Sequence, residues 1–352
     1  MIFCGDTIFP GTFDPVLLRD CNEEFLAKPK VVNLESLIEL KKMKKTAPGI
    51  GLVSSPDTVP FLEAMHVRGC VLANNHVTDF DVSIEEQKRY LLEHGIQSCG
   101  AGDNLTEASS PCFFKEGGEE TAVLAFGWET ISCVAATERS KGVNPLRYDH
   151  VRKQVEDFLK MRPDTPLVIV FHWDYEYEQY PQPAHRKLAF ELIDMGAHAV
   201  IGHHPHIVQG AEIYKGRPIF YSLGNFYFPA GMHSGFEVTP PEAAYSGLCV
   251  EIAEDAEKCT LYWTKLHRDG RIVLEKKEFL SQSKKLENLT PFTGMPHEEY
   301  VAWFRQNRHK KKLLPIYKNP ASKVETVFND LWVGSRQHLI DFLVRLRSRS
   351  QT

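Results

Sequence analysis

The chain has 352 residues, of which 43% are hydrophobic and 25% charged, and its formal net charge is −5 at pH 7. These values are ordinary for a globular protein built as one large domain, or as one domain with an appendage. The mildly acidic balance gives no reason to expect a nucleic-acid partner.

The eight cysteines form no CxxC pair, and several of them lie in apolar runs. This distribution is typical of reduced, buried thiols in a cytosolic protein. No apolar run reaches the length of a membrane span, and no signal-peptide core precedes the first predicted strand. We therefore expect a cytoplasmic protein without a membrane anchor.

Strands and helices alternate through the first two thirds of the chain. Ser55-Pro56 and Ser83 are predicted helix starts, and Gly95 and Gly196 are predicted helix ends. The alternation predicts an α/β fold. We expect strands at 2–4, 31–34, 70–73, 96–98, 121–126, 167–171 and 198–201, and helices at 59–67, 84–94, 150–159 and 186–195.

The last third of the chain does not continue the alternation of strands and helices. Segments 246–252, 259–266 and 271–279 predict three consecutive antiparallel strands, and two helices are expected at 298–308 and 324–346. We predict one domain over residues 1–280 and a helical extension over 281–352 that packs on it. The final helix is expected to dock through its apolar side chains, with a homodimer contact as the alternative. These side chains are Phe328, Leu331, Trp332, Leu339, Phe342, Leu343 and Leu346.

Polar residues follow the ends of five predicted strands. Strand ends at one edge of a wound sheet converge, and that edge is the usual site of α/β proteins. Carboxylate, amide and imidazole donors without a thiolate suit Mn, Fe or Zn. In His204-Pro205-His206, strand-like alternation would place both imidazoles on one side. The five ends carry Asp6, Glu35, Asn75 with His76, His172, and His204 with His206.

Each residue of this set also has a plainer interpretation. Glu35 could be a surface carboxylate, Asn75 could belong to an ordinary turn, and His172 could be a core histidine. Three histidines within four positions directly after an apolar strand are harder to explain by packing. The sequence therefore favours a metal or catalytic site here.

Seven segments between residues 1 and 228 carry a resemblance to a known family. They are FCGDTIF, VNLES, LANNHVTDFD, GAGDNLTEA, FHWDYEY, VIGHHPHIVQGAE and IFYSLGNFYF. The chain resembles the CapA-like family, which is named for poly-γ-glutamate capsule synthesis and is related to the calcineurin-like metallophosphoesterases. The resemblance implies a β-sandwich of two mixed sheets flanked by helices, in four layers α/β/β/α.

The resemblance also implies one or two divalent metal ions and a ligand set. Asp6 is similar to the aspartate that touches both metals, and Glu35 to the bridging carboxylate. Asn75, His172 and His204 would hold one metal and His206 the other. The related phosphoesterases have a histidine where this chain has Ile8, so we expect one tight metal position and one weak or vacant position.

The resemblance further implies catalytic roles for His76, which Asp79 would orient, and for Glu176. Arg186, Trp173 and Asn225 are expected to bind a small-molecule or peptide substrate. Three functions remain open at this point. They are metal-dependent hydrolysis of a phosphoester or amide, epimerisation at a peptide Cα by acid–base chemistry, and a non-catalytic part in polymer synthesis.

Overall fold

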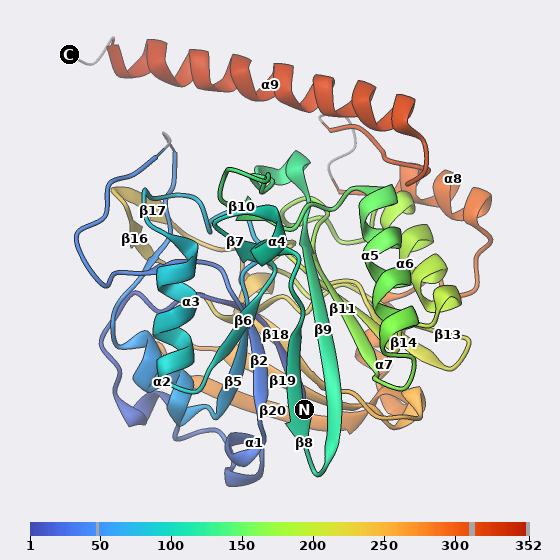
Figure 1. Ribbon diagram of the computed structural model, residues 1–352, viewed down its shortest axis with the longest axis horizontal. Coiled ribbons are helices and arrows are strands. Elements are labelled where there is room, and N and C mark those ends of the chain that lie inside the picture. The colour runs from blue at the N-terminus through green and yellow to red at the C-terminus, as the bar shows by residue number, and fades with distance from the viewer. Residues whose placement is uncertain (47–48, 310–313, 350–352) are drawn as a thin grey trace.

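Two mixed β-sheets form the centre of the molecule (Figure 1). The computed structural model describes residues 1–46, 49–309 and 314–349, with side chains as far as residue 336. The first sheet has the order β20 (Ile272–Phe279), β19 (Thr260–Leu266), β18 (Ser246–Glu251), β1 (Ile2–Thr7), β2 (Lys30–Leu34), β5 (Val67–Val71) and β6 (Gln97–Cys99), and β15 (Asn225–Tyr227) also pairs with β1.

The second sheet is parallel at its centre and antiparallel at both edges. Its three central pairings, between β9, β11, β12 and β14, are parallel, and the outer strands β8 and β13 pair antiparallel. Its order is β13 (Ala211–Tyr214), β14 (Arg217–Phe220), β12 (Ala199–His203), β11 (Leu167–His172), β9 (Glu119–Gly127) and β8 (Cys112–Glu116).

Alternate side chains of the strands divide between two apolar cores. Phe3 of β1 and Val170 of β11 lie in the core between the sheets, whereas their neighbours Cys4 and Phe171 belong to the core under the helices. This division follows from the two-residue period of a strand. The central strands β1, β2, β11 and β12 are buried on both faces, and the predicted four-layer fold is confirmed.

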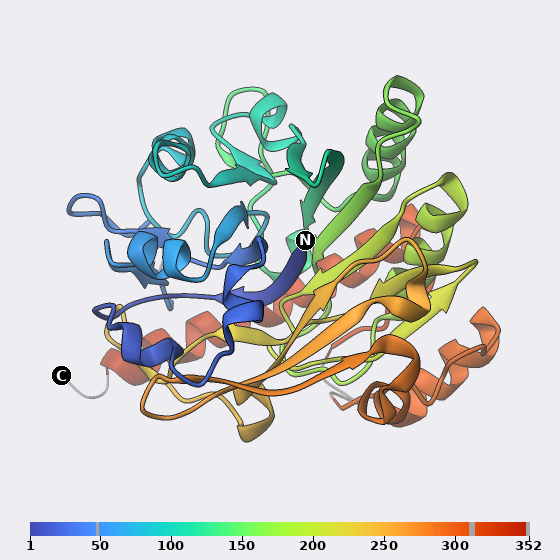
Figure 2. The same cartoon turned by 90° about the horizontal axis from the view of Figure 1, so that it is seen from below.

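Helices cover the outer face of each sheet (Figures 1 and 2). The helices α2 (Thr58–Ala64) and α3 (Ile84–Glu93) lie on the first sheet, and α5 (Tyr148–Met161) and α6 (Pro183–Met195) on the second. Shorter elements fill the connections. They are α1 (Glu23–Ala27), α4 (Leu105–Ala108), and the strand pairs β3 (Leu37–Ile38) with β4 (Val53–Ser54), β7 (Ala101–Gly102) with β10 (Gly142–Val143), and β16 (Gly231–His233) with β17 (Phe236–Val238).

Three of the four predicted helix boundaries are confirmed. The Ser83 side chain accepts a hydrogen bond from the Glu86 amide at the start of α3. Gly95 and Gly196 follow the ends of α3 and α6 with φ of 71° and 117°. The prediction for Ser55 is wrong. The helix α2 begins three residues later, and the Ser55 hydroxyl donates to the Gly11 carbonyl instead.

The segment after residue 280 packs on the helices of the second sheet. It contains α7 (Lys284–Leu289) and α8 (His297–Asn307), and α8 lies against α6. Phe292, Tyr300 and Phe304 are fully buried and join the core under the helices. The domain boundary at residue 280 stays a prediction.

The last helix, α9 (Lys323–Arg349), crosses the top of the molecule in Figure 1. The expectation that its apolar side chains dock on the domain is wrong for the described part, because Phe328 is 72%, Leu331 64% and Trp332 58% exposed. In the described part of the chain, every helix is either too short or too polar to span a membrane. Leu339, Phe342, Leu343 and Leu346 lie outside the residues whose side chains the structure describes.

Gly202, near the end of β12, permits the close contact that positions the histidines after it. A Cβ at this position would lie 1.9 Å from the Tyr221 carbonyl oxygen and 2.3 Å from Nε1 of Trp173. We expect Gly202→Ala to lower the free energy of unfolding by about 3 kcal/mol or more, because neither neighbour can move freely. Thermal unfolding measures the effect. Gly11→Ala, which adds a Cβ in open space, is the matched control, and equal melting temperatures for the two variants would contradict the argument.

Candidate metal centre

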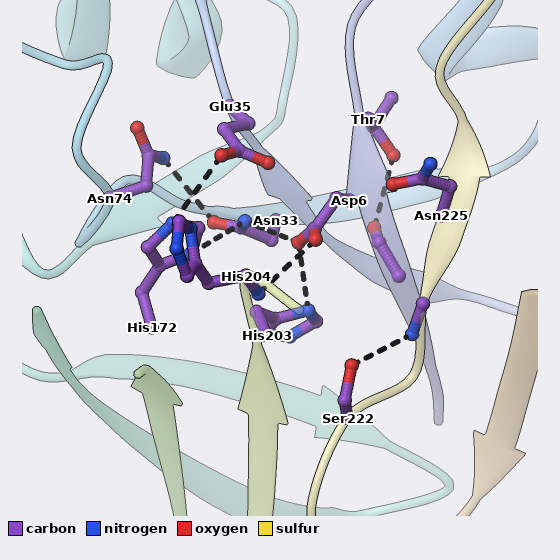
Figure 3. A network of polar contacts seen from close by, with 12 residues as sticks. Asp6, Thr7, Asn33, Glu35, Asn74, His172, His203, His204, Ser222 and Asn225 are labelled. Carbon is purple, nitrogen blue, oxygen red and sulfur yellow. Dashed lines mark hydrogen bonds and ion pairs between the residues drawn. The ribbon is translucent and has the colours of Figure 1, made fainter. Parts of the chain in front are cut away.

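The polar strand ends converge, but between two sheets and not along one sheet edge as predicted. Asp6 belongs to β1 and Glu35 directly follows β2, both in the first sheet. His172 is the last residue of β11, and His204 follows β12, both in the second sheet. Figure 3 shows the carboxylates of one sheet facing the imidazoles of the other. The site therefore depends on how the two sheets pack.

Glu35 joins two groups of donor atoms. Glu35, His172 and His204 form one group, and Asp6, Glu35 and His206 form the other; within each group the candidate ligand atoms lie within 4.8 Å of one another. Oε1 of Glu35 is 3.4 Å from Nε2 of His172 and 3.7 Å from Nε2 of His206. The amide oxygen of Asn75 lies 2.7 Å from Nε2 of His172. The structure thus brings all six predicted ligands together.

The Glu35 carboxylate has the properties expected of a metal ligand. It is fully buried, and within the described part of the chain neither of its oxygens has a hydrogen-bond partner. A buried charge without a partner is costly, and such groups normally pair or bind an ion. A divalent cation between the two groups would satisfy both oxygens, so the donor set fits the predicted metal.

Burial and charge pull the pKa values of this cluster in opposite directions. Burial raises the pKa of Glu35 to about 8 although the charge of His206 opposes it. Burial would lower the pKa of His206, but Glu35 and Asp6 raise it to about 10. Burial lowers the pKa of both His172 and His204 well below the ordinary value. The last two imidazoles are therefore neutral at pH 7, which is the form that binds a metal.

The two donor groups are unequal. Among the described residues, the group around His172 and His204 has the Asn75 amide oxygen beside Nε2 of His172 as a fourth candidate donor. In the group around His206, the neighbouring amide oxygen, that of Asn225, lies beside Nδ1 of His206 instead. Ile8, two residues after Asp6, is fully buried in a small apolar cluster with Leu52 and Phe228 and supplies no ligand. The expectation of one tight and one weak metal position stays a prediction.

The local geometry of His204-Pro205-His206 differs from the strand-like alternation that we expected. The strand β12 ends at His203, and the two histidines beyond it adopt left-handed backbone conformations, with φ of 94° and 57°. Such conformations are uncommon for residues other than glycine, and strained residues of this kind cluster at active sites and ligand clamps. The turn directs the two imidazoles into different donor groups.

Sequence reasoning missed two residues that hold Asp6 in place. The Asn33 side chain donates a 2.7 Å hydrogen bond to Oδ1 of Asp6, and Nδ1 of His203 lies 3.2 Å from the same oxygen. Burial alone would raise the pKa of Asp6, but His203 and His206 hold it well below its usual value. The run of histidines in the sequence could have identified His203. No sequence feature distinguishes Asn33, because it lies within a predicted strand.

The predicted catalytic pair lies at the rim of this cluster. Nδ1 of His76 is 2.7 Å from Oδ2 of Asp79, which also accepts a 2.9 Å hydrogen bond from the Leu52 amide. Both side chains of the pair are 16% exposed. Glu176 is exposed, and its charge helps to raise the pKa of His206, so it too lies near the site. These three positions agree with the predicted roles but do not test them.

The predicted substrate-binding residues are placed differently from what we expected. Trp173 is fully buried, and its Nε1 donates to the Tyr221 carbonyl. Arg186 is also buried and forms a two-pronged ion pair with Glu212. Neither presents a free group to a substrate, so both predictions are wrong. Asn225 lies in the site but is 3% exposed, and its Oδ1 is 2.9 Å from Nδ1 of His206, which orients that ring.

Comparison with known proteins shows the family of this chain. The family described as bacterial capsule synthesis protein PGA_cap matches residues 2–230. The chain belongs to this family. It is 31% identical over 199 residues to the capsule biosynthesis protein CapA of Bacillus anthracis, covering 55% of this chain and 48% of that protein. It is also 31% identical over 202 residues to the PGA biosynthesis protein CapA of Bacillus subtilis (strain 168), covering 56% of this chain and 53% of that protein.

The chain thus spans about half the length of the curated relatives it matches. Among solved structures, it is similar to a hypothetical protein from Thermus thermophilus, with a TM-score of 0.41 and 16% identity over 79% of this chain and 97% of that one. A putative 5′-nucleotidase from Staphylococcus aureus gives a TM-score of 0.41 and 12% identity, over 86% and 58% of the two chains.

The unequal donor groups predict different effects of two histidine substitutions. His204→Ala removes a donor from the four-donor group and should abolish tight metal binding. His206→Ala should spare the tight metal and lose only the weak one. Metal content per chain, measured by mass spectrometry after dialysis, distinguishes the two. His94→Ala, at an exposed His–Glu pair outside the site, is the control. Equal metal loss in both site variants would contradict the assignment.

Metal affinity should rise with pH. In the metal-free site the pKa of Glu35 is raised to about 8 and that of His206 to about 10, so this interacting pair retains at least one proton at pH 7 that neither group would give up easily. A metal ion must displace the protons of this pair, so its apparent Kd should fall by up to about tenfold per pH unit for each proton released. Titration calorimetry between about pH 6 and pH 8, in buffers of different ionisation enthalpy, counts the protons. An affinity that does not change with pH would exclude this coupling.

Proposed function

We propose that this chain is a metal-dependent hydrolase that cleaves a phosphoester or an amide. One observation carries the proposal, namely the buried Glu35 carboxylate that joins two donor groups while His76 and Asp79 lie at the rim. A structural site would need the ligands but not a histidine–carboxylate pair beside them. A divalent Mn, Fe or Zn ion held by the donor groups would lower the pKa of a water at the site and polarise the substrate.

His76 is suited to move the proton in this reaction. Asp79 accepts a hydrogen bond from Nδ1 of His76, which fixes the tautomer and leaves Nε2 for the substrate. When protonated, the ring can donate from Nε2 to the leaving oxygen or nitrogen. The charge of His76 also lowers the pKa of Glu35, so the ring lies within electrostatic range of the shared carboxylate.

Peptide epimerisation is the second candidate. It requires proton carriers on two sides of a Cα. The charge of His76 lowers the pKa of His172 and His204, and the charge of Glu176 raises that of His206, so each lies near a different pair of donors. A non-catalytic part in capsule polymer synthesis, the process after which the matched relatives are named, is the third. Hydrolysis is favoured because it needs only the His76–Asp79 pair and the donor groups.

The decisive experiment is a turnover screen of the metal-loaded protein. The substrates are an aryl phosphate, an aryl phosphodiester and short glutamyl peptides, and the peptides are also incubated in deuterium oxide. Product release supports hydrolysis. Deuterium uptake at Cα without cleavage supports epimerisation, and a stably bound metal with neither activity supports the non-catalytic role.

Replacing His76 should separate catalysis from metal binding. We expect His76→Ala to lower kcat by about 10²–10⁴-fold, the range for loss of a general acid–base group, and to retain its metal. Asp79→Asn should give an intermediate loss, because it removes the charge that orients the ring. His94→Ala should behave as wild type. If His76→Ala lost its metal, or kept full turnover, the catalytic role of His76 would be refuted.

A further inference from the structure

The loop between β11 and α6, residues 173–182, contacts the metal centre on the side of His206. The ring of Tyr177 lies 6.2 Å from the ring of His206. The Tyr177 amide donates a 2.9 Å hydrogen bond to the Pro205 carbonyl. The loop therefore touches the turn that carries two of the candidate ligands, and from this position a side chain can reach a bound substrate.

Unusual backbone conformations are concentrated where this loop meets the turn. Eight residues other than glycine have a positive φ in the described part of the chain, and half of them lie here. They are Asp174 (61°) and Tyr177 (57°) in the loop, and His204 (94°) and His206 (57°) in the turn. Strained residues persist only where their surroundings hold them, and they cluster at active sites and ligand clamps. The loop shares this property with the ligand turn that it contacts.

The segment after residue 280 holds the loop from its other side. The Tyr300 hydroxyl donates a 2.7 Å hydrogen bond to the Pro181 carbonyl, and the Tyr317 amide donates a 3.1 Å hydrogen bond to Oε1 of Gln182. Within the loop, the Gln182 amide donates a 2.8 Å hydrogen bond to Oδ1 of Asp174. These contacts fix the loop, so the Tyr177 side chain is positioned before a substrate arrives.

The hydroxyl of Tyr177 is within electrostatic range of the shared carboxylate. Burial raises the pKa of this phenol, and the nearby charges of Glu176 and Glu35 raise it further. At pH 7 the hydroxyl is therefore protonated and can donate a hydrogen bond. Its present partner is the Glu176 carboxylate. Because Glu176 is exposed, it can give way to an oxygen of a bound substrate.

His76 and Tyr177 approach the centre from different sides. In addition to burial, the charge of His76 lowers the pKa of His172 and His204, whereas the Tyr177 ring lies against His206. Hydrolysis uses two hydrogen-bond donors, one for the leaving atom and one for the oxygen on which negative charge develops. His76 is suited to the first role, and Tyr177 is placed for the second.

We propose that Tyr177 is a substrate-binding residue, and that its hydroxyl donates a hydrogen bond to the non-leaving oxygen of a substrate at the metal centre. This role depends on the proposed hydrolase function and assigns to it the donor opposite His76. A donor held in place stabilises the transition state more than the bound substrate, because the charge on the oxygen grows during the reaction. It also gives the segment after residue 280 a function, since that segment holds the loop.

The first test is the binding of inorganic phosphate to the metal-loaded protein, measured by titration calorimetry at pH 7. Tyr177→Phe keeps the ring beside His206 and removes only the hydroxyl. We expect its Kd for phosphate to rise about tenfold or more, because a hydrogen bond to an anion is lost, while its metal content stays that of the wild type. Tyr214→Phe, which removes a hydroxyl 3.3 Å from Asp194 on an edge strand of the second sheet, should bind phosphate as the wild type does.

Three results of this test would overturn the role of Tyr177. The first is equal phosphate affinity in Tyr177→Phe and the wild type, whether or not any substrate is turned over. The second is a loaded wild type that binds no phosphate at millimolar concentration, since no oxyanion then lies beside the hydroxyl. The third is loss of metal from Tyr177→Phe, because the residue would then support the metal and not the substrate. Failure of the hydrolase function is seen separately, as a wild type that binds phosphate but turns nothing over.

The second test compares kinetic parameters on whichever substrate of the turnover screen is cleaved. Tyr177→Phe should lower kcat by about 10²-fold, the effect of losing one donor to the developing charge, and should change KM less. A purely structural effect on the loop would instead lower the melting temperature. A Tyr177→Phe variant with unchanged kcat, or one whose lower kcat comes with a lower melting temperature, contradicts the role of the hydroxyl.

Discussion

The burial of the Glu35 carboxylate is the constraint on which the site depends. An ionised carboxylate in the interior needs a compensating charge or hydrogen bonds, and in the described structure neither oxygen of Glu35 has a hydrogen bond. The same carboxylate lies between two histidines of different donor groups. A divalent cation resolves this conflict. Removing Glu35 would therefore affect both halves of the site at once, whereas removing one histidine would affect only one.

The two-sheet architecture makes that burial possible. The first sheet delivers the carboxylates and the second delivers the imidazoles, and the apolar core between the sheets fixes the distance between them. Close packing at Gly202, the hydrogen bond from Asn33 to Asp6 and the close contact of His203 with the same carboxylate hold the donors in place. Loosening the sandwich should weaken the metal site even when every ligand is retained.

Arg186 and the side chains of α9 both differ from what their residue types led us to expect. Arg186 was expected to bind substrate, but it is buried against Glu212 and packs over Tyr300, so it fastens α8 to the second sheet. On α9 the polar residues make the internal contacts and the apolar residues are exposed. In both cases the burial of the residue, rather than its type, shows what it does.

The sequence by itself determined the order of the main elements, the caps of α3 and α6 and the fold class, and it pointed to the six candidate ligands that the structure brings together. These are local signals, because helix and strand periods and capping residues act within a few positions, and the histidines directly follow an apolar strand. The expected positions of Asp6, His172 and His204 at strand ends are those found in the structure.

Only the tertiary structure decided which residues meet. The packing of the two sheets places ligands on both of them and brings Asn33 and His203 next to Asp6. It also buries Trp173 and Arg186 and leaves the apolar face of α9 exposed. The physical reason is that these outcomes depend on contacts between segments far apart in the chain. A local pattern shows that a side chain is polar or apolar, but only packing decides which surface covers it.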